Sequence, residues 1–262
     1  MKLLYLLLWL LGITNIHAQA IEKHTLYSQY TKRHYNVAIK KPEGFDLHSH
    51  YILLFVPDGA LGLGRHLLDS DIKMGKAIVP PNCIVIALQQ TGRERTDRNR
   101  DFIPSDIRKN SRKNFGRAHC FYRFMKDEWI PYVDSLLPKP NQKILLGHSL
   151  SGLVCLYAAL QEEPLFDQYF AISPSVWANH FELLKIEKAY ARQHNDLKRT
   201  IHIFAGSKEV FDLIRYSTHR FVKAVTGRKY PSLALDYTII KGKDHFTVRK
   251  PVVDRILQGL TQ

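Results

Sequence analysis

The sequence predicts an α/β fold, in which helices cover both faces of a twisted, mostly parallel sheet of eight strands. Short apolar runs with the length of buried strands alternate along the chain with longer segments of helical pattern, as they do in parallel sheets. One apolar run, at residues 144–146, leads through a turn of small residues into a second apolar run of helical length. Residues 21–262 have enough apolar content for one large domain, and they contain no internal repeat.

The first 20 residues are typical of an export signal. Lys2 provides the positive end, residues 3–13 the apolar core, and Ala18-Gln19-Ala20 a cleavage site of small residues. The apolar run is too short to span a membrane. We therefore predict an exported protein, periplasmic or secreted, whose mature chain begins at Ile21. A buried N-terminal strand or helix is the alternative interpretation.

The first half of the chain predicts four strands and one helix. Residues 24–30 and 33–40 are expected to pair antiparallel at the edge of the sheet, before a turn at residues 41–44. Residues 51–56 and 83–88 are continuous apolar runs, as buried strands are. Residues 65–78 predict a helix that ends before Pro80, and residues 89–116 form a polar, basic segment.

The second half alternates helices with strands. Residues 118–137 predict a long amphipathic helix, which Pro131 kinks or restarts. Strands are predicted at residues 144–146, 168–172, 200–205 and 233–240, and helices at residues 153–160, 180–193 and 251–260. In such a sheet, ligands bind beyond the carboxyl ends of the strands.

Ser149 follows one of these strand ends in a strand–turn–helix context. Gly147 lies two places before it, as in the strained turn that holds a nucleophilic serine above a sheet. The usual pattern has glycine two places after the serine, where this chain has Ser151, a mild departure. The alternative is a buried turn without catalysis. Ser151 is a poorer nucleophile candidate, because Ser149 and Leu153 would then occupy the small-residue positions.

Two further strand ends supply the partners that a serine nucleophile needs. A histidine takes the serine proton and returns it to the leaving group, and a carboxylate orients the histidine. His245 follows the last predicted strand in a short Gly/Lys/Asp loop, and Glu209 follows the strand before it. The order serine, acid, histidine is that of the α/β-hydrolase triad. Asp212 is the alternative acid, and Asp244 is expected to be a turn residue.

Two backbone N–H groups must face the oxyanion that forms on the substrate. We assign them to Leu150, at the start of the helix after the nucleophile, and to the Gly59/Ala60 turn after the strand at residues 51–56. Both positions lie at the same edge of the predicted sheet as Ser149.

The chain resembles the putative esterase family of the α/β-hydrolase superfamily. That group contains siderophore (enterobactin-type) esterases, feruloyl and acetyl-xylan esterases and S-formylglutathione hydrolases. The matching segments run in family order at residues 56–59 (VPDG), 96–105 (TDRNRDFIPS), 124–133 (FMKDEWIPYV), 147–153 (GHSLSGL), 171–177 (AISPSVW) and 242–245 (GKDH). The likeness is greatest to the periplasmic siderophore-hydrolase branch. It implies an α/β-hydrolase fold and hydrolysis of carboxylic esters through an acyl-enzyme on Ser149, with His245 as base. Some members of that branch work with a serine–histidine pair and a weakly placed acid, so the resemblance leaves the role of Glu209 open.

Residues 92–117 carry nine Lys or Arg against four Asp or Glu, and enter the rim beside Ser149. One interpretation is a cap that attracts an anionic substrate such as a catecholate siderophore, through Arg98 and Arg100. The other is a solvated loop in which Arg98 pairs with Asp97 and Arg100 with its neighbour. Trp177 is expected either to line the acyl pocket or to close the core beneath it.

Several function classes remain open at this point. The formal net charge of +14 favours an anionic substrate, an anionic surface or simply solubility over nucleic-acid binding in an exported protein. The three cysteines show no metal or redox spacing, so we expect no metal and no cofactor, and leave a single disulfide open. The substrate is expected to be a small-molecule or carbohydrate ester. An acyltransferase and a non-catalytic binding protein are the alternatives to an esterase.

Overall fold

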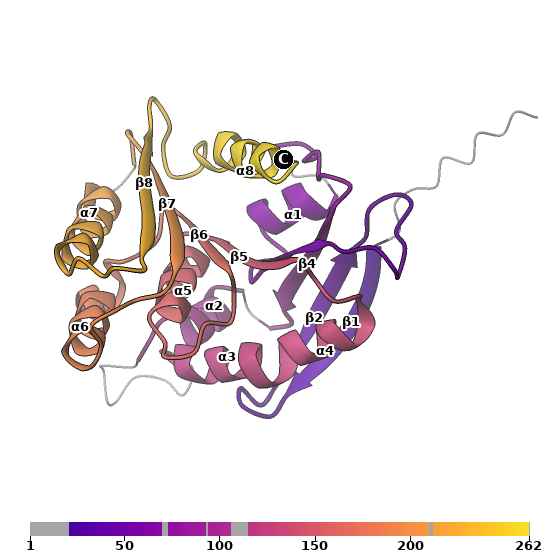
Figure 1. Ribbon diagram of the computed structural model, residues 1–262, viewed down its shortest axis with the longest axis horizontal. Coiled ribbons are helices and arrows are strands. Elements are labelled where there is room, and N and C mark those ends of the chain that lie inside the picture. The colour runs from indigo at the N-terminus through magenta and orange to yellow at the C-terminus, as the bar shows by residue number, and fades with distance from the viewer. Residues whose placement is uncertain (1–20, 70–72, 93, 106–114, 210–211, 262) are drawn as a thin grey trace, which may run out of the picture.

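The computed structural model describes residues 21–69, 73–92, 94–105, 115–209 and 212–261 (Figure 1). The predicted signal peptide, residues 1–20, lies outside the described residues. The strands are β1 (Ile21–Ser28), β2 (Arg33–Lys40), β3 (Ile52–Val56), β4 (Cys83–Gln90), β5 (Gln142–His148), β6 (Gln168–Ile172), β7 (Thr200–Gly206) and β8 (Ala234–Ile240). The helices are α1 (Gly62–Leu68), α2 (Glu94–Phe102), α3 (Ala118–Phe124), the π-helical turn η1 (Met125–Trp129), α4 (Ile130–Leu136), α5 (Leu150–Ala159), α6 (Ala178–Gln193), α7 (Asp212–Gly227) and α8 (Arg249–Gly259).

The strands form one eight-stranded sheet in the order β1-β2-β4-β3-β5-β6-β7-β8. β1 pairs antiparallel with β2, and β2 pairs antiparallel with β4. The other neighbours are parallel. The predicted fold class is therefore confirmed, including the antiparallel pair at one edge. Parallel pairing from β4 to β8 brings the carboxyl ends of these strands to one edge of the sheet.

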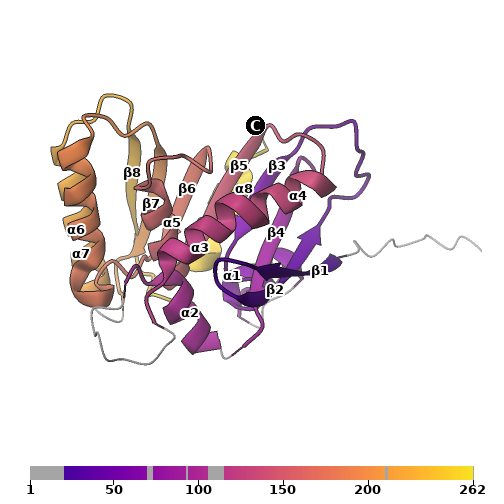
Figure 2. The ribbon, with the colours of Figure 1, turned by 90° about the horizontal axis from the view of Figure 1, so that it is seen from below.

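Alternating side chains along the central strands build two cores, one on each face. In β3, Leu53 and Phe55 belong to one buried cluster, and Leu54 and Val56 to the other. Helices α3 to α7 cover the first face, while α1 and α8 cover the second (Figures 1 and 2). This arrangement leaves the carboxyl edge of the strands for a site.

One helical prediction is mostly wrong, and two helices were not predicted. The first helix spans only Gly62–Leu68, so the expected helix at residues 65–78 is mostly wrong. Helices α2 and α7 were not predicted, and α2 lies within the polar, basic segment at residues 89–116. The long helix predicted at residues 118–137 is confirmed as the contiguous elements α3, η1 and α4, and Pro131 lies in the first turn of α4, directly after η1, consistent with the predicted restart.

Among the described residues, no helix is both long enough and apolar enough to cross a membrane. Cys83, Cys120 and Cys155 are all free thiols, so the disulfide that the sequence left open does not form. Cys83 and Cys155 are buried, as expected of small apolar side chains.

A buried ion network fixes α2 to the sheet. The Arg100 guanidinium is only 2% exposed and donates to both oxygens of Asp101, at 2.7 and 2.8 Å, and to Asp97 at 2.6 Å. The Tyr35 hydroxyl of β2 donates to Asp101 at 3.0 Å. The predicted role of Arg100 in substrate binding is therefore wrong, because its donors are committed to buried carboxylates. The expected Arg100–Asp101 pair forms.

We expect Arg100→Met to lower the free energy of unfolding by about 3–5 kcal/mol, because it leaves the buried Asp101 without its counter-ion and leaves Asp97 with the more distant Arg33, at 3.4 Å. Burial already raises the pKa of Asp101, against the opposing bonds from Arg100 and Tyr35. Without Arg100 that pKa rises further, so the loss of stability is greatest at neutral pH and shrinks as the pH falls through it. Urea denaturation at several pH values measures this. The exposed Arg192→Met is the control, and an equal, pH-independent loss in both variants would contradict the prediction.

Candidate active site

A strained turn between β5 and α5 holds Ser149. Its φ of 61° and ψ of −115° lie outside the regions that side chains other than glycine usually adopt. The turn is close because a Cβ on Gly147 would meet the Ser151 carbonyl oxygen at 2.3 Å. The Ser149 N–H donates to the Ile172 carbonyl of β6 at 2.9 Å, which fixes the turn against the neighbouring strand.

The unusual Ser151 of the motif has a local role. Its side chain is fully buried, and its Oγ accepts the His148 N–H and donates to the His148 carbonyl, both at 2.9 Å. The hydroxyl thus satisfies two backbone groups of the tight turn that would otherwise lack partners. The departure from glycine is therefore compatible with the strand–helix approach at this position.

The structure brings the three predicted side chains together. His245 Nε2 lies 3.1 Å from Ser149 Oγ, and His245 Nδ1 lies 3.0 Å from Glu209 Oε2. They come from the turns after β5, β7 and β8, which meet at the carboxyl edge of the sheet. Asp212, the alternative acid, is the first residue of α7. Asp244 accepts the N–H groups of Phe246 and Thr247 and is the turn residue that we expected.

Glu209 is held as a carboxylate. Burial by itself raises the pKa of Glu209, but hydrogen bonds from His245, Ser173 and Gly206 outweigh it and hold that pKa below its usual range. The Ser173 hydroxyl and the Gly206 N–H donate to Oε1 at 2.5 and 2.9 Å, which leaves Oε2 for the imidazole. An ionised Glu209 only accepts, so the nitrogen facing it, His245 Nδ1, carries the proton.

His148, next to the nucleophile, anchors the histidine loop. Its Nε2–H donates to the main-chain carbonyl of His245 at 2.8 Å, and the two ring centroids are 4.6 Å apart. Burial, followed by the nearby charge of His245 and Arg249, holds the pKa of His148 well below its usual range. A neutral His148 adds no positive charge beside His245. This contact joins residues 97 positions apart, so no local sequence pattern reveals it.

The two turns that were expected to supply oxyanion donors differ in which of their N–H groups are available. The Leu150 N–H opens α5 and has no acceptor inside the helix. In the other turn, the Gly59 N–H donates to the Leu88 carbonyl at 2.7 Å, so it is not available to an oxyanion and that assignment is wrong. Among the backbone hydrogen bonds between described residues, none uses the Ala60 N–H. The candidate pair is therefore Leu150 and Ala60.

A cleft of about 910 Å³ opens over Ser149. It is lined by Arg95 and Arg98 from α2, and by Trp177, which is 38% exposed. Arg98 also donates to both oxygens of Asp58 at 3.0 Å, rather than to Asp97 as the local-pairing interpretation expected. Arg98 and Trp177 thus lie where the sequence predicted a substrate, and Arg100 does not.

A left-handed turn that the sequence did not reveal also lines the cleft. Asn179, His180 and Phe181 have φ values of 51°, 58° and 57°, a conformation that costs about 1–2 kcal/mol for each residue. The Asn179 side chain supports the turn by donating to the Ser105 carbonyl and to Glu182, both at 2.6 Å. All three residues of the turn line the cleft, so part of its lining is strained backbone.

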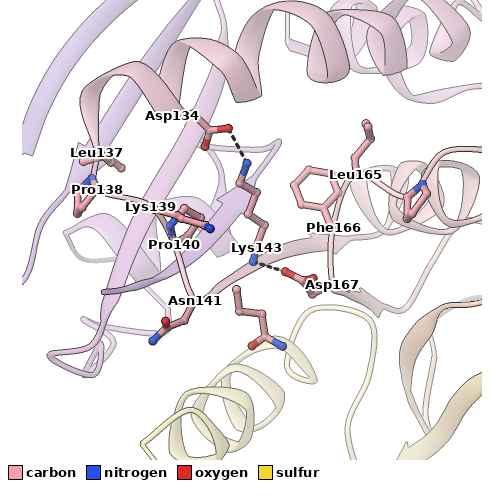
Figure 3. Close-up of a pocket in the computed structure, with 12 residues that line it drawn as sticks. Asp134, Leu137, Pro138, Lys139, Pro140, Asn141, Lys143, Leu165, Phe166 and Asp167 are labelled. Carbon is pink, nitrogen blue, oxygen red and sulfur yellow. Dashed lines mark hydrogen bonds and ion pairs between the residues drawn. The ribbon is translucent and has the colours of Figure 1, made fainter. Parts of the chain in front are cut away.

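A second cavity, of about 650 Å³, lies at the amino ends of β5 and β6 (Figure 3). Lys143 crosses it, with its Nζ donating to Asp134 at 2.6 Å and its N–H to Asp167 at 2.7 Å. The described residues that line it include no nucleophile beside a base. Nowhere in the described part of the chain do three or more His, Cys, Asp or Glu side chains lie close enough together to hold a metal ion. The cleft over Ser149 is therefore the candidate active site.

Comparisons with known proteins show the family of the chain. The family model described as "Putative esterase" matches residues 28–247. The chain is 24% identical over 255 residues to "Ferri-bacillibactin esterase BesA" of Bacillus subtilis, covering 90% of this chain and 88% of that protein. It is 35% identical over 78 residues to "Siderophore triacetylfusarinine C esterase" of Aspergillus fumigatus, and the match spans only 27% of the fungal protein and 29% of this chain.

The crystal structure of an IroE-like serine hydrolase from Shewanella oneidensis is similar, with a TM-score of 0.74 at 19% identity. The similarity covers 92% of this chain and 80% of that one, and supports the α/β-hydrolase fold. The match to the family model confirms the family that the sequence indicated, and with it the predicted class of enzyme, an esterase.

Proposed function

The chain belongs to the putative esterase family of the α/β-hydrolase superfamily, and from this premise we propose that it hydrolyses carboxylic esters through an acyl-enzyme on Ser149. The observation that carries the proposal is the chain of contacts from Ser149 Oγ to His245 and on to the buried Glu209, at 3.1 and 3.0 Å. In this proposal His245 is the base and Glu209 the group that orients it.

In the first half-reaction, Ser149 Oγ attacks the acyl carbon while its proton moves to His245 Nε2. The N–H groups of Leu150 and Ala60 stabilise the negative charge on the former carbonyl oxygen. The imidazolium then gives the proton to the departing alkoxide, which leaves as an alcohol and leaves the acyl group on Ser149. The carboxylate of Glu209 stabilises the imidazolium without taking its proton.

In the second half-reaction, neutral His245 takes a proton from water, and the oxygen of that water attacks the acyl carbon. The bond from carbon to Ser149 Oγ breaks, the proton returns to Oγ, and a carboxylic acid is released. A water-accessible cleft over Ser149 suits this step. An alcohol acceptor in place of water would give the acyltransferase alternative, and no feature of the described cleft favours it.

We expect Ser149→Ala to lower kcat toward a chromogenic short-chain ester by on the order of 10⁴-fold or more. Glu209→Gln should lower kcat by about 10²–10⁴-fold, because the amide cannot stabilise the imidazolium and favours the wrong tautomer. Circular dichroism should show a folded chain in both variants. Equal rates in wild type and Ser149→Ala would remove the esterase proposal, whereas full activity in Glu209→Gln alone would reduce the triad to a serine–histidine pair.

We also propose that the substrate is a siderophore ester that carries negative charge and aromatic groups. Both curated relatives compared above are named as siderophore esterases. The cleft is lined by Arg95 and Arg98 and by the aromatic Trp177 and Phe181, and Arg220 stacks on the Phe181 ring at 5.3 Å. Cationic and aromatic side chains at one mouth suit an anionic, aromatic ligand better than a neutral sugar.

A substrate panel tests this proposal. We expect a tricatecholate ester to be cleaved with a higher kcat/KM than a feruloylated sugar or an acetylated xylan. Arg95→Gln should raise KM several-fold for the anionic ester only, and added salt should have the same effect by screening. Arg192→Gln, which removes the same charge from an exposed position on α6, is the matched control. A higher kcat/KM for acetylated xylan would contradict the siderophore proposal and favour a carbohydrate ester as the substrate.

We propose in addition that the enzyme is exported, with Met1 to Ala20 removed as a signal peptide. The charged start, short apolar core and small-residue cleavage site of these residues support it. N-terminal sequencing of the protein recovered from the periplasm or medium should then begin at Ile21. An uncleaved chain found only inside the cell would contradict export.

A further inference from the structure

We propose that Ser175 is a further catalytic residue, whose hydroxyl donates a hydrogen bond to the nucleophilic oxygen of Ser149. The two Oγ atoms are 3.2 Å apart. This inference rests on the proposed function, because it concerns the same nucleophile. Ser175 follows β6 at the carboxyl edge of the sheet, and its side chain lines the cleft over Ser149.

The direction of the Ser149–Ser175 hydrogen bond follows from the donors present. Glu209 is ionised and accepts from His245 Nδ1, so in neutral His245 the other nitrogen, Nε2, carries no proton and accepts. The single hydroxyl proton of Ser149 must therefore point to Nε2, 3.1 Å away. The proton between the two serine oxygens can then come only from Ser175.

The position of Ser175 is fixed from several sides. The residue is 2% exposed, and its N–H donates to the Ser149 carbonyl at 3.0 Å, so the backbones of the two serines are joined as well as their hydroxyls. Two residues earlier, Ser173 donates to Glu209 at 2.5 Å. The short segment after β6 thus contacts both ends of the Ser149–His245–Glu209 chain.

A donor at this place acts on the charge that develops on Ser149 Oγ. In acylation, negative charge grows on Oγ as its proton moves to His245, before the bond to the acyl carbon is complete. In deacylation, the electron pair of the breaking carbon–oxygen bond returns to Oγ, before His245 returns the proton. A hydrogen bond from Ser175 stabilises both transition states, and it also keeps the Ser149 rotamer directed at Nε2.

The test compares Ser175→Ala with wild type on a p-nitrophenyl ester. We expect kcat to fall about 10- to 100-fold, the effect of losing one hydrogen bond to a charged group, with KM nearly unchanged. The rate of covalent labelling of Ser149 by a fluorophosphonate should fall by a similar factor, because that reaction needs the nucleophile but no deacylation. Ser175→Cys, with a weak donor of similar size, should lie between the two.

Ser217→Ala is the matched control, because it also removes a buried serine hydroxyl, one that donates to the Ile214 carbonyl inside α7. Its kinetics should equal those of wild type. Unchanged kcat in Ser175→Ala would overturn the inference. A higher kcat would also overturn it, since Ser175 would then compete with His245 for the Ser149 proton. A raised KM with unchanged kcat would show a role only in shaping the cleft.

Ser149→Ala, measured in parallel, separates the two proposals. If wild type is active and Ser149→Ala is not, a normal rate in Ser175→Ala defeats only the role of Ser175. If Ser149→Ala retains the wild-type rate, both proposals fail. Should Ser175→Ala not fold, as judged by circular dichroism, the Ser175→Cys variant and its labelling rate decide the question.

Discussion

The close approach of β5 and α5 determines where every other group of the site can lie. A Cβ at Gly147 would meet the backbone of Ser151, so the chain can turn here only with glycine at that position. The turn forces Ser149 into a left-handed φ and directs its Oγ away from the strand. The same geometry opens α5 with the Leu150 N–H beside the nucleophile. One steric constraint thus positions both the nucleophile and one oxyanion donor.

The remaining groups reach Ser149 on loops, and the structure fixes those loops through hydrogen bonds to charged or buried partners. His245 is held at its side chain by Glu209 and at its main-chain carbonyl by His148. Because His148 is buried and neutral, it restrains the loop without repelling an imidazolium at His245. Glu209 is restrained in turn by Ser173 and Gly206. The base therefore needs little reorganisation when charge moves through it.

The sequence predicted the sheet, its edge pair and the three convergent side chains, because these depend on local patterns and on one topological rule. Apolar runs mark buried strands, and parallel strands bring their carboxyl ends together. Helix α7 was missed although its sequence has an amphipathic pattern. The wrong role for Arg100 and the wrong donor at Gly59 have another cause, since both depend on contacts between distant residues. Only the packed structure shows that Arg100 faces Asp97 and Asp101, and that the Gly59 N–H meets Leu88.

Two arginines in the described part of the basic segment, Arg98 and Arg100, are paired with carboxylates and contribute less free positive charge than the composition suggests. The charge of Arg100 is neutralised by buried carboxylates. Arg98 forms a bidentate pair, through Nε and Nη2, with Asp58, the residue before the Gly59/Ala60 turn. Since Arg98 also lines the cleft, an anionic group that approaches it must share it with Asp58. An anionic group bound to Arg98 would therefore change the Arg98–Asp58 ion pair, next to the turn that carries the Ala60 N–H. The Arg98–Asp58 ion pair thus links α2 to the turn that carries the proposed oxyanion donor. Arg95 is exposed, and it is the arginine of α2 better suited to bind a substrate without disturbing that turn.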